Sequence, residues 1–95
     1  MLYSVIIPCY RSDQTIEHVV NTTREEMNKL GRGNVEFVLV NDCSPDGGKT
    51  IAKLIQMAKE YPDVKVIDLA VNSGQHNALM AALRHADGDV IIGMD

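Results

Sequence analysis

The chain has 95 residues, of which 45% are hydrophobic and 23% are charged, a balance that supports a folded core and argues against disorder. Its net charge of −4 argues against a protein that binds nucleic acid through a basic surface. The length predicts one domain or part of one.

Two cysteines, Cys9 and Cys43, stand at predicted strand ends without a CxxC spacing. This pattern favours buried thiols in a reducing compartment over the alternatives of a disulfide or a metal site. The sequence has no signal-peptide pattern at its start, and no apolar run approaches the ~20 residues of a membrane span. We therefore expect a soluble, cytoplasmic piece of protein.

Four apolar segments rich in β-branched residues predict strands, at residues 4–8, 35–40, 64–69 and 90–94. The first and fourth segments are apolar on both faces. The pattern of the first segment is typical of a central parallel strand. The third alternates and is expected nearer an edge. Pro8 is expected to close the first strand because it has no N–H for the ladder.

Three segments between these strands predict helices. The first begins at a cap on Ser12 or Asp13 and stops at Gly31. The second begins at Ser44 or Asp46, and the third covers residues 75–86. The apolar residues expected to face the sheet are Ile16, Val19, Val20, Thr23, Met27 and Leu30 in the first, Ile51, Leu54, Ile55 and Ala58 in the second, and Ala78, Leu79, Ala82 and Leu83 in the third.

Strict alternation of strands and helices predicts an α/β fold, with a Rossmann-like parallel sheet of about four strands and helices on both faces. The fourth strand is apolar throughout, and such a strand needs a cover. The sequence is therefore expected to be a fragment of a longer chain.

Polar residues follow three of the predicted strands directly, and the carboxyl ends of parallel strands meet at one edge of a sheet, where ligands bind. The clearest case is Asp42, which follows Val38–Asn41 and is expected to contact a nucleotide. Asp46 is better explained as a helix cap. For Asp95 a solvated terminus stays an alternative to a ligand contact.

Four motifs in order give the chain a resemblance to the nucleotide-binding half of family 2 glycosyltransferases with the GT-A fold. They are Ser4–Tyr10, Glu36–Gly47, Asn72–Ala78, and Ala86–Ile91 followed by Met94-Asp95. The resemblance covers residues 1–95 and implies a partial GT-A domain that binds a nucleotide-sugar, with a UDP-sugar favoured.

The resemblance also implies the site residues. The nucleotide-binding set is Pro8, Cys9, Tyr10, Asn41, Asp42, Asn72 and Gln75. Pro8 and Tyr10 would line the base pocket, and Asp42 would accept hydrogen bonds from the base or ribose. Asp95 would be the first Asp of a DxD motif that binds Mg²⁺ or Mn²⁺ against the diphosphate.

The implied activity is transfer of a sugar to an acceptor by an inverting enzyme, with a catalytic base beyond residue 95, so that the fragment alone would be inactive. The segment Gly74–Ala78 resembles the polyprenyl-phosphate branch, whose members charge a lipid carrier at the cytoplasmic face of the cell membrane for cell-envelope polysaccharide.

Two departures from the family pattern stand in the predicted site. Asn41-Asp42 replaces the Asp-Asp of many relatives, and Arg11-Ser12 replaces their Asn-Glu. Arg11 either reaches a phosphate or is a solvated loop residue.

Two functions other than glycosyl transfer are kept as alternatives. One is a non-catalytic α/β nucleotide-binding module, and the other is a self-associating interaction unit. A receiver-like module is disfavoured because no acidic cluster follows the first strand, and a dinucleotide-binding domain because GxGxxG is absent.

Overall fold

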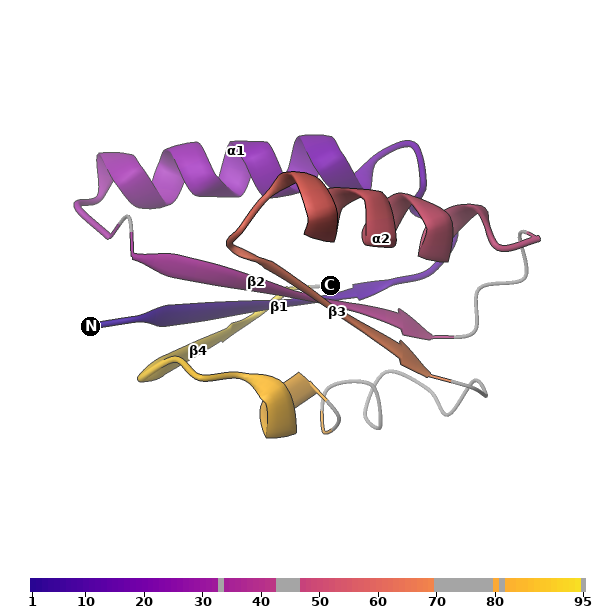
Figure 1. Cartoon of the computed structure of the whole chain (residues 1–95). Coiled ribbons are helices and arrows are strands. Elements are labelled where there is room, and N and C mark those ends of the chain that lie inside the picture. The colour runs from indigo at the N-terminus through magenta and orange to yellow at the C-terminus, as the bar shows by residue number, and fades with distance from the viewer. Residues whose placement is uncertain (33, 43–46, 70–79, 81, 95) are drawn as a thin grey trace.

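The structure, a computed structural model, describes residues 1–32, 34–42, 47–69, 80 and 82–94. Its elements in chain order are β1 (Tyr3–Cys9), α1 (Ile16–Lys29), β2 (Val35–Asp42), α2 (Lys49–Glu60), β3 (Val64–Leu69) and β4 (Val90–Gly93). A short helical stretch at residues 82–85 precedes β4. The four strands form one parallel sheet in the order β3-β2-β1-β4 (Figure 1).

This sheet confirms the predicted α/β class, the central place of β1 and the edge place of β3. The fourth strand, β4, lies at the opposite edge, where it pairs with β1 from Tyr3–Val90 to Ile6–Gly93. Ile91 on β4 remains 40% exposed. On the other side of β1, the β1–β2 ladder runs from Tyr3–Val35 to Cys9–Asn41.

Helices cover both faces of the sheet, as predicted, but unequally. In Figure 1, α1 and α2 lie on one face and the stretch at 82–85 lies on the other. The larger core is formed by α1, α2 and odd-numbered residues of β1 and β2, such as Val5, Phe37 and Leu39. The smaller core joins Ile6, Val38, Val40 and Ala82. Alternate strand residues thus enter different cores, because side chains alternate across a strand.

Pro8 does not end β1, contrary to the expectation from its missing N–H. It lies inside the strand, opposite Val40 of β2. The carbonyl of Ile6 accepts the Met94 N–H at 2.9 Å, so the backbone groups of alternate β1 residues, Pro8 among them, point toward β4. The β1–β4 ladder already ends at Ile6–Gly93, and Pro8 therefore interrupts no ladder bond.

The predicted start of α1 is wrong by a few residues, whereas its end is confirmed. The N-cap is Thr15 rather than Ser12 or Asp13, and the carbonyl of Ser12 accepts the N–H groups of Thr15 and Ile16. At the other end Gly31 has φ 73°. The Gly31 N–H bonds to the Asn28 carbonyl and the next N–H to the Met27 carbonyl, which is a Schellman stop.

The expected cap of α2 at Ser44 or Asp46 is also wrong, because the N-cap is Gly48 with φ 86°. Gly47, with φ 73°, precedes it. Two consecutive left-handed residues cannot belong to a right-handed helix, so α2 begins only at Lys49.

The buried faces of the helices differ in part from the prediction. Along α1, Ile16, Val20 and Met27 are buried, but Leu30 is 64% exposed. Along α2 the buried residues are Thr50, Leu54 and Met57, and Ile55 is 46% exposed. In the third helix Ala82 is buried as predicted, Leu83 is 40% exposed, and Ala78 and Leu79 lie outside the described residues.

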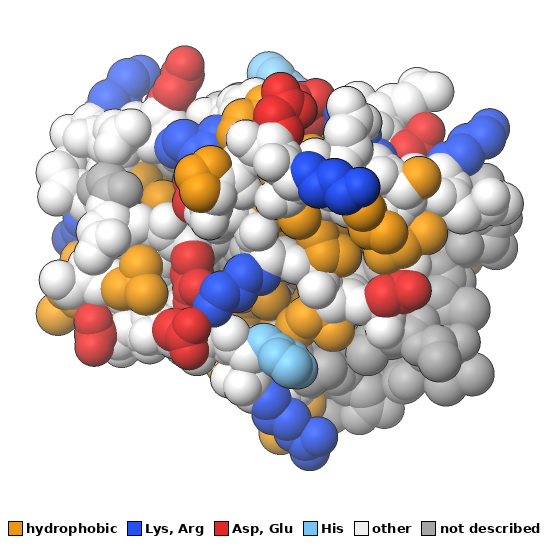
Figure 2. Space-filling view, in the orientation of Figure 1, with side chains coloured by type: hydrophobic (Ala, Val, Ile, Leu, Met, Phe, Trp, Pro, Cys, Tyr) orange, Lys and Arg blue, Asp and Glu red, His pale blue; other side chains and the backbone are white. Residues whose placement is uncertain are grey.

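Ile55 lies on α2, which contacts mainly the edge strand β3. Figure 2 shows hydrophobic side chains in a band below α2, on the side where β3 forms the edge of the sheet. A helix that packs beside an edge strand has sheet beneath only part of its surface. Its apolar stripe is therefore incompletely covered.

A hydrogen-bonded carboxylate ties α1 to α2. Glu17 accepts from Lys53 Nζ at 2.7 Å and from the Tyr61 hydroxyl at 2.7 Å. These two bonds hold the pKa of Glu17 below its ordinary value. The carboxylate therefore links two helices on the same face of the sheet.

Candidate functional site

The strand order places a topological switch point between β1 and β4. From β1 the chain goes first to β2 on one side and later to β4 on the other. Connections that leave a parallel sheet in opposite directions open a crevice at the carboxyl ends of the two strands, and open α/β sheets bind ligands there. Sequence alone placed all three polar clusters at one edge, and the strand order now singles out the end of β1.

A pocket of about 300 Å³ lies at this end of β1. Its walls come from the last residues of β1, the loop that follows and the first turn of α1. The lining residues are Ile7, Pro8, Tyr10, Ser12, Thr15, Ile16 and Val19. Two residues from the predicted base pocket, Pro8 and Tyr10, thus contribute to one cavity, whose other walls combine apolar side chains with the hydroxyl residues Ser12 and Thr15.

The loop after β1 presents Tyr10 to solvent. The Tyr10 ring is 52% exposed, and the guanidinium carbon of Arg11 lies 5.8 Å from its centroid. Arg11 has φ 52°, a left-handed conformation that is uncommon for a residue with a side chain. Ser12 stabilises the turn, because its hydroxyl donates to the Tyr10 carbonyl at 3.1 Å and its N–H donates to Thr50 Oγ1 at 3.1 Å. An exposed aromatic face on a fixed loop suits stacking against a planar base.

Cys9 points away from this pocket into the larger core. Its side chain is fully buried, and its thiol donates to the Ile7 carbonyl. Burial raises the pKa of the Cys9 thiol to about 12, so the sulfur is neutral and unreactive. The expectation of a buried thiol is confirmed for Cys9. A contact of Cys9 with a nucleotide would have to use its backbone.

Asn41 also faces the larger core, where its amide pairs with a carboxylate of the neighbouring strand β3. The residue is 5% exposed, and its Nδ2 donates to Oδ1 of Asp68 on β3 at 2.8 Å. A carboxylate at position 41 would place two negative charges at this distance, whereas an amide supplies the donor that Asp68 needs. Asn41 Oδ1 has no hydrogen-bond partner among the described residues.

Asp68 itself was missed by the sequence analysis. It stands at the carboxyl end of β3, opposite Asn41, and is exposed. The available signal was the polar break at the end of an alternating strand. The pairing of the two side chains depends on the β2–β3 register, which the sequence did not specify.

For the other predicted site residues, the structure describes only the backbone of Asp42. The backbone of Asp42 closes β2 opposite Leu69, but its side chain is outside the described part of the structure, as are Asn72, Gln75 and Asp95. The chain leaves β4 through Met94, whose N–H bonds to β1 two residues before Pro8. Within the ranges described, β4 therefore leads the chain toward the pocket at the end of β1.

The described residues contain no group of three His, Cys, Asp or Glu side chains that could bind a metal ion. No helix in the same ranges is long and apolar enough to cross a membrane.

A parallel α/β sheet with a pocket at its topological switch point defines a class of domain that binds ligands at the carboxyl ends of its strands. The sequence comparisons identify the family. Residues 4–95 match the profile of the family described as Glycosyl transferase family 2, and the chain belongs to this family.

Curated relatives and a solved structure agree with this assignment. The chain is 34% identical over 94 residues to the undecaprenyl-phosphate 4-deoxy-4-formamido-L-arabinose transferases of Shewanella sediminis and Proteus mirabilis. The matched region is 97% of this chain but only 27% and 28% of the two relatives. A mannosyltransferase from Pyrobaculum calidifontis, PcManGT, solved with GDP-Man and Mn²⁺, superposes with a TM-score of 0.76 at 30% identity, over 94% of this chain and 25% of that one.

The chain thus spans roughly a quarter of the length of the relatives it matches. The fold likeness to this mannosyltransferase confirms the Rossmann-like architecture predicted from the alternation of strands and helices.

Proposed function

We propose that this chain binds the nucleotide of a nucleotide-sugar donor and that the protein transfers the sugar to an acceptor. The observation that carries the proposal is the pocket at the switch point, in which Pro8 and Tyr10 lie together at the end of β1. Membership of Glycosyl transferase family 2 and the likeness to a protein solved with GDP-Man support it.

The residues would divide the work as follows. Tyr10 stacks on the base and Pro8 supports the pocket, while Asp42 accepts hydrogen bonds from the base edge or the ribose. Asn72 and Gln75 contact the nucleotide from the segment after β3, and Cys9 and Asn41 contribute backbone groups and the shape of the strand ends. A UDP-sugar is the proposed donor.

We propose Mg²⁺ or Mn²⁺ as the cofactor, with Asp95 as a protein ligand. The Mn²⁺ in the related mannosyltransferase structure supports a divalent ion. Bound there, the ion would offset the negative charge of the diphosphate.

Transfer is proposed to be inverting, with a base that deprotonates the acceptor hydroxyl in a single displacement. Because the chain matches about a quarter of its relatives, we place that base in the part of the relatives that this chain does not match, and the chain alone would bind without turnover.

The relatives named as undecaprenyl-phosphate transferases support a polyprenyl phosphate as acceptor, reached at the cytoplasmic face of a membrane. In a membrane preparation that contains the complete protein, added undecaprenyl phosphate should increase transfer of label from a nucleotide-sugar into lipid. Label that appears only in water-soluble product would contradict this acceptor.

Calorimetric titration of the chain tests the nucleotide proposal. UDP and GDP are titrated with Mn²⁺, with Mg²⁺ and with neither ion, and circular dichroism establishes that the sample is folded. We expect saturable binding of UDP that a divalent ion strengthens. No heat with either diphosphate from a folded sample would contradict the proposal and favour an interaction module without nucleotide.

A further inference from the structure

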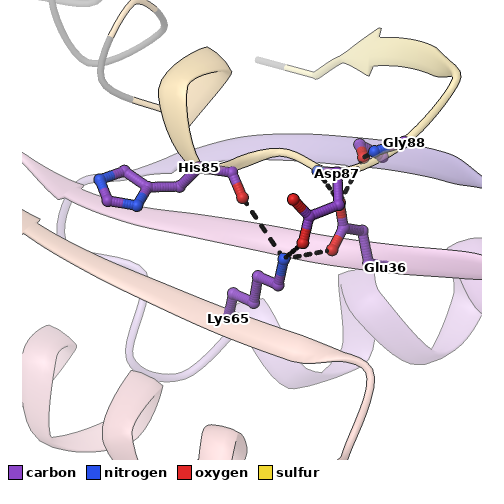
Figure 3. Close-up of polar contacts among 6 residues, drawn as sticks. Glu36, Lys65, His85, Asp87 and Gly88 are labelled. Atoms are coloured by element: carbon purple, nitrogen blue, oxygen red, sulfur yellow. Dashed lines mark hydrogen bonds and ion pairs between the residues drawn. The ribbon is translucent and has the colours of Figure 1, made fainter.

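Glu36 is a buried carboxylate at the amino end of the sheet, remote from the pocket. It is 7% exposed and lies on the face of β2 opposite α1 and α2. Its Oε2 accepts from Ser4 Oγ at 2.5 Å and from the Asp87 N–H at 2.7 Å, and its Oε1 lies 2.8 Å from Lys65 Nζ (Figure 3). Three donors from three different segments therefore converge on one side chain.

Lys65 extends the same network to the segment before β4. Its Nζ contacts Asp87 Oδ2 at 2.6 Å and the His85 carbonyl at 3.3 Å as well as Glu36. Figure 3 shows Lys65 reaching across from β3 to the end of the helical stretch at 82–85. Figure 2 shows a basic side chain between acidic ones on this face of the molecule. The ammonium thus has an acceptor for each of its three protons.

Gly88 lies so close to β1 that a side chain has no room. Its N–H donates to Ser4 Oγ at 2.8 Å. A Cβ at this position would lie 2.2 Å from Ser4 Oγ and 2.7 Å from Ser4 N. The next residue continues the attachment, since Asp89 N donates to the Leu2 carbonyl at 2.8 Å and Leu2 N donates to Asp89 Oδ2 at 2.9 Å.

The network therefore specifies where β4 begins along β1. Four residue pairs form the β1–β4 ladder, a short contact for an edge strand. If β4 shifted by one residue along β1, Ile91 would take the place of Ile92, which packs against the larger core. The chain then leaves β4 about 13 Å from the network, at the switch point.

We propose that Glu36 is a positioning residue: it fixes Asp87 and Gly88 on β1, sets the register of β4, and so directs Met94 toward the end of β1 that carries the Pro8–Tyr10 pocket. This inference rests on the proposed function, because the pocket is taken to bind the nucleotide and the chain after β4 to serve its diphosphate. Glu36 contacts neither the pocket nor the chain after β4, and it acts through the position of β4.

The test compares Glu36→Gln with a matched control, Glu17→Gln. Both carboxylates accept from a lysine and a hydroxyl, but Glu17 joins α1 to α2 and has no contact with β4 among the described residues. The first readout is hydrogen exchange at the Met94 amide, at the far end of β4 from Glu36. We expect exchange at Met94, through local opening of β4, about tenfold faster in Glu36→Gln and like the parent chain in Glu17→Gln. Leu39 in the central β2 exchanges through global unfolding and should change only as far as the measured free energy of unfolding does.

The second readout separates positioning from general weakening. With Mn²⁺ present, the gain in affinity from uridine to UDP should fall about tenfold in Glu36→Gln, while affinity for uridine stays the same. Equal losses for both ligands, or unchanged Met94 exchange, would overturn the proposal. If the parent chain binds neither ligand, the proposed function fails, and Met94 exchange alone decides the positioning role. Should Glu36→Gln not fold, Lys65→Met takes its place with the same expected results.

Discussion

The polar residues at the two ends of the sheet differ in how far their side chains are used in hydrogen bonds within the protein. At the amino end, Glu36, Ser4 and Lys65 use their hydrogen-bonding groups on one another and on the segment before β4. At the carboxyl end, Tyr10 is half exposed and Asn41 Oδ1 has no partner within the described part of the chain. Polar residues at the amino end therefore stabilise the fold, whereas at the carboxyl end the exposed Tyr10 side chain is open to a ligand.

The difference follows from the cost of burying charge. A buried carboxylate is stable only when several hydrogen-bond donors surround it. Removing one donor leaves part of the buried charge unpaired, and this costs more free energy than one hydrogen bond contributes. Such a site has no free group to offer a substrate. Substitutions at the amino end should therefore lower stability most, and substitution of an exposed residue at the carboxyl end, such as Tyr10, should change binding at little cost to stability.

The largest effect is expected for Gly88→Ala. The new methyl group would overlap the Ser4 hydroxyl and backbone, so the segment before β4 must move, and the free energy of unfolding should fall by about 3 kcal/mol. Urea denaturation measures this loss. Gly93→Ala is the control, because a Cβ at Gly93 meets nothing within 4 Å. Equal stability of the two variants would show that the close approach at Gly88 is unimportant.

Glu36→Gln should lower the free energy of unfolding by about 2 kcal/mol at pH 7. Burial alone would raise the pKa of Glu36, but hydrogen bonds from Lys65, Ser4 and the Asp87 N–H outweigh it and lower this pKa below 4.5. A lowered pKa stabilises the fold above pH 4.5, and that contribution disappears as the pH falls through the folded-state pKa.

The difference between parent and Glu36→Gln should therefore shrink below pH 4.5, as measured by denaturation at several pH values. Glu26→Gln provides the control, since its 3.4 Å contact with Lys29 is exposed and should contribute nothing measurable. A constant difference from pH 7 to pH 3 would contradict the role assigned to the charge of Glu36.

Tyr10→Ala tests the carboxyl end. Affinity for UDP should fall about tenfold because the stacking face is lost, while the free energy of unfolding stays nearly unchanged for a half-exposed ring. Calorimetry and denaturation provide the two numbers. Tyr10→Phe keeps the ring and should keep the affinity. Loss of stability without loss of affinity would reverse the assignment of this end of the sheet.

The smallest effect is expected for Asn41→Asp, which should lower the free energy of unfolding by about 1 kcal/mol at pH 7 through repulsion with Asp68. Because Asp68 is exposed, water screens much of the repulsion. The double variant Asn41→Asp, Asp68→Asn restores a donor and an acceptor and should regain the lost stability. A double variant less stable than either single change would contradict the pairing.

Several features could be predicted from the chain alone. Apolar runs with β-branched residues identified β1, β2, β3 and β4, and Gly31 identified the end of α1, because both signals are local. Helix starts were less predictable, since the cap of α1 depends on the turn after Ser12 and that of α2 on two left-handed glycines. Ile55 and Leu83 were expected to be buried because periodicity does not reveal where a sheet ends.

The sequence by itself determined the alternation of strands and helices, the family, and the presence of Pro8 and Tyr10 in the candidate site. Only the tertiary structure decided that β4 pairs with β1, that Asn41 faces Asp68, and that Glu36 anchors the segment before β4. The reason is physical: residues 4, 36, 65 and 88 are far apart in the chain, and their contacts depend on strand order and register, which no local pattern records.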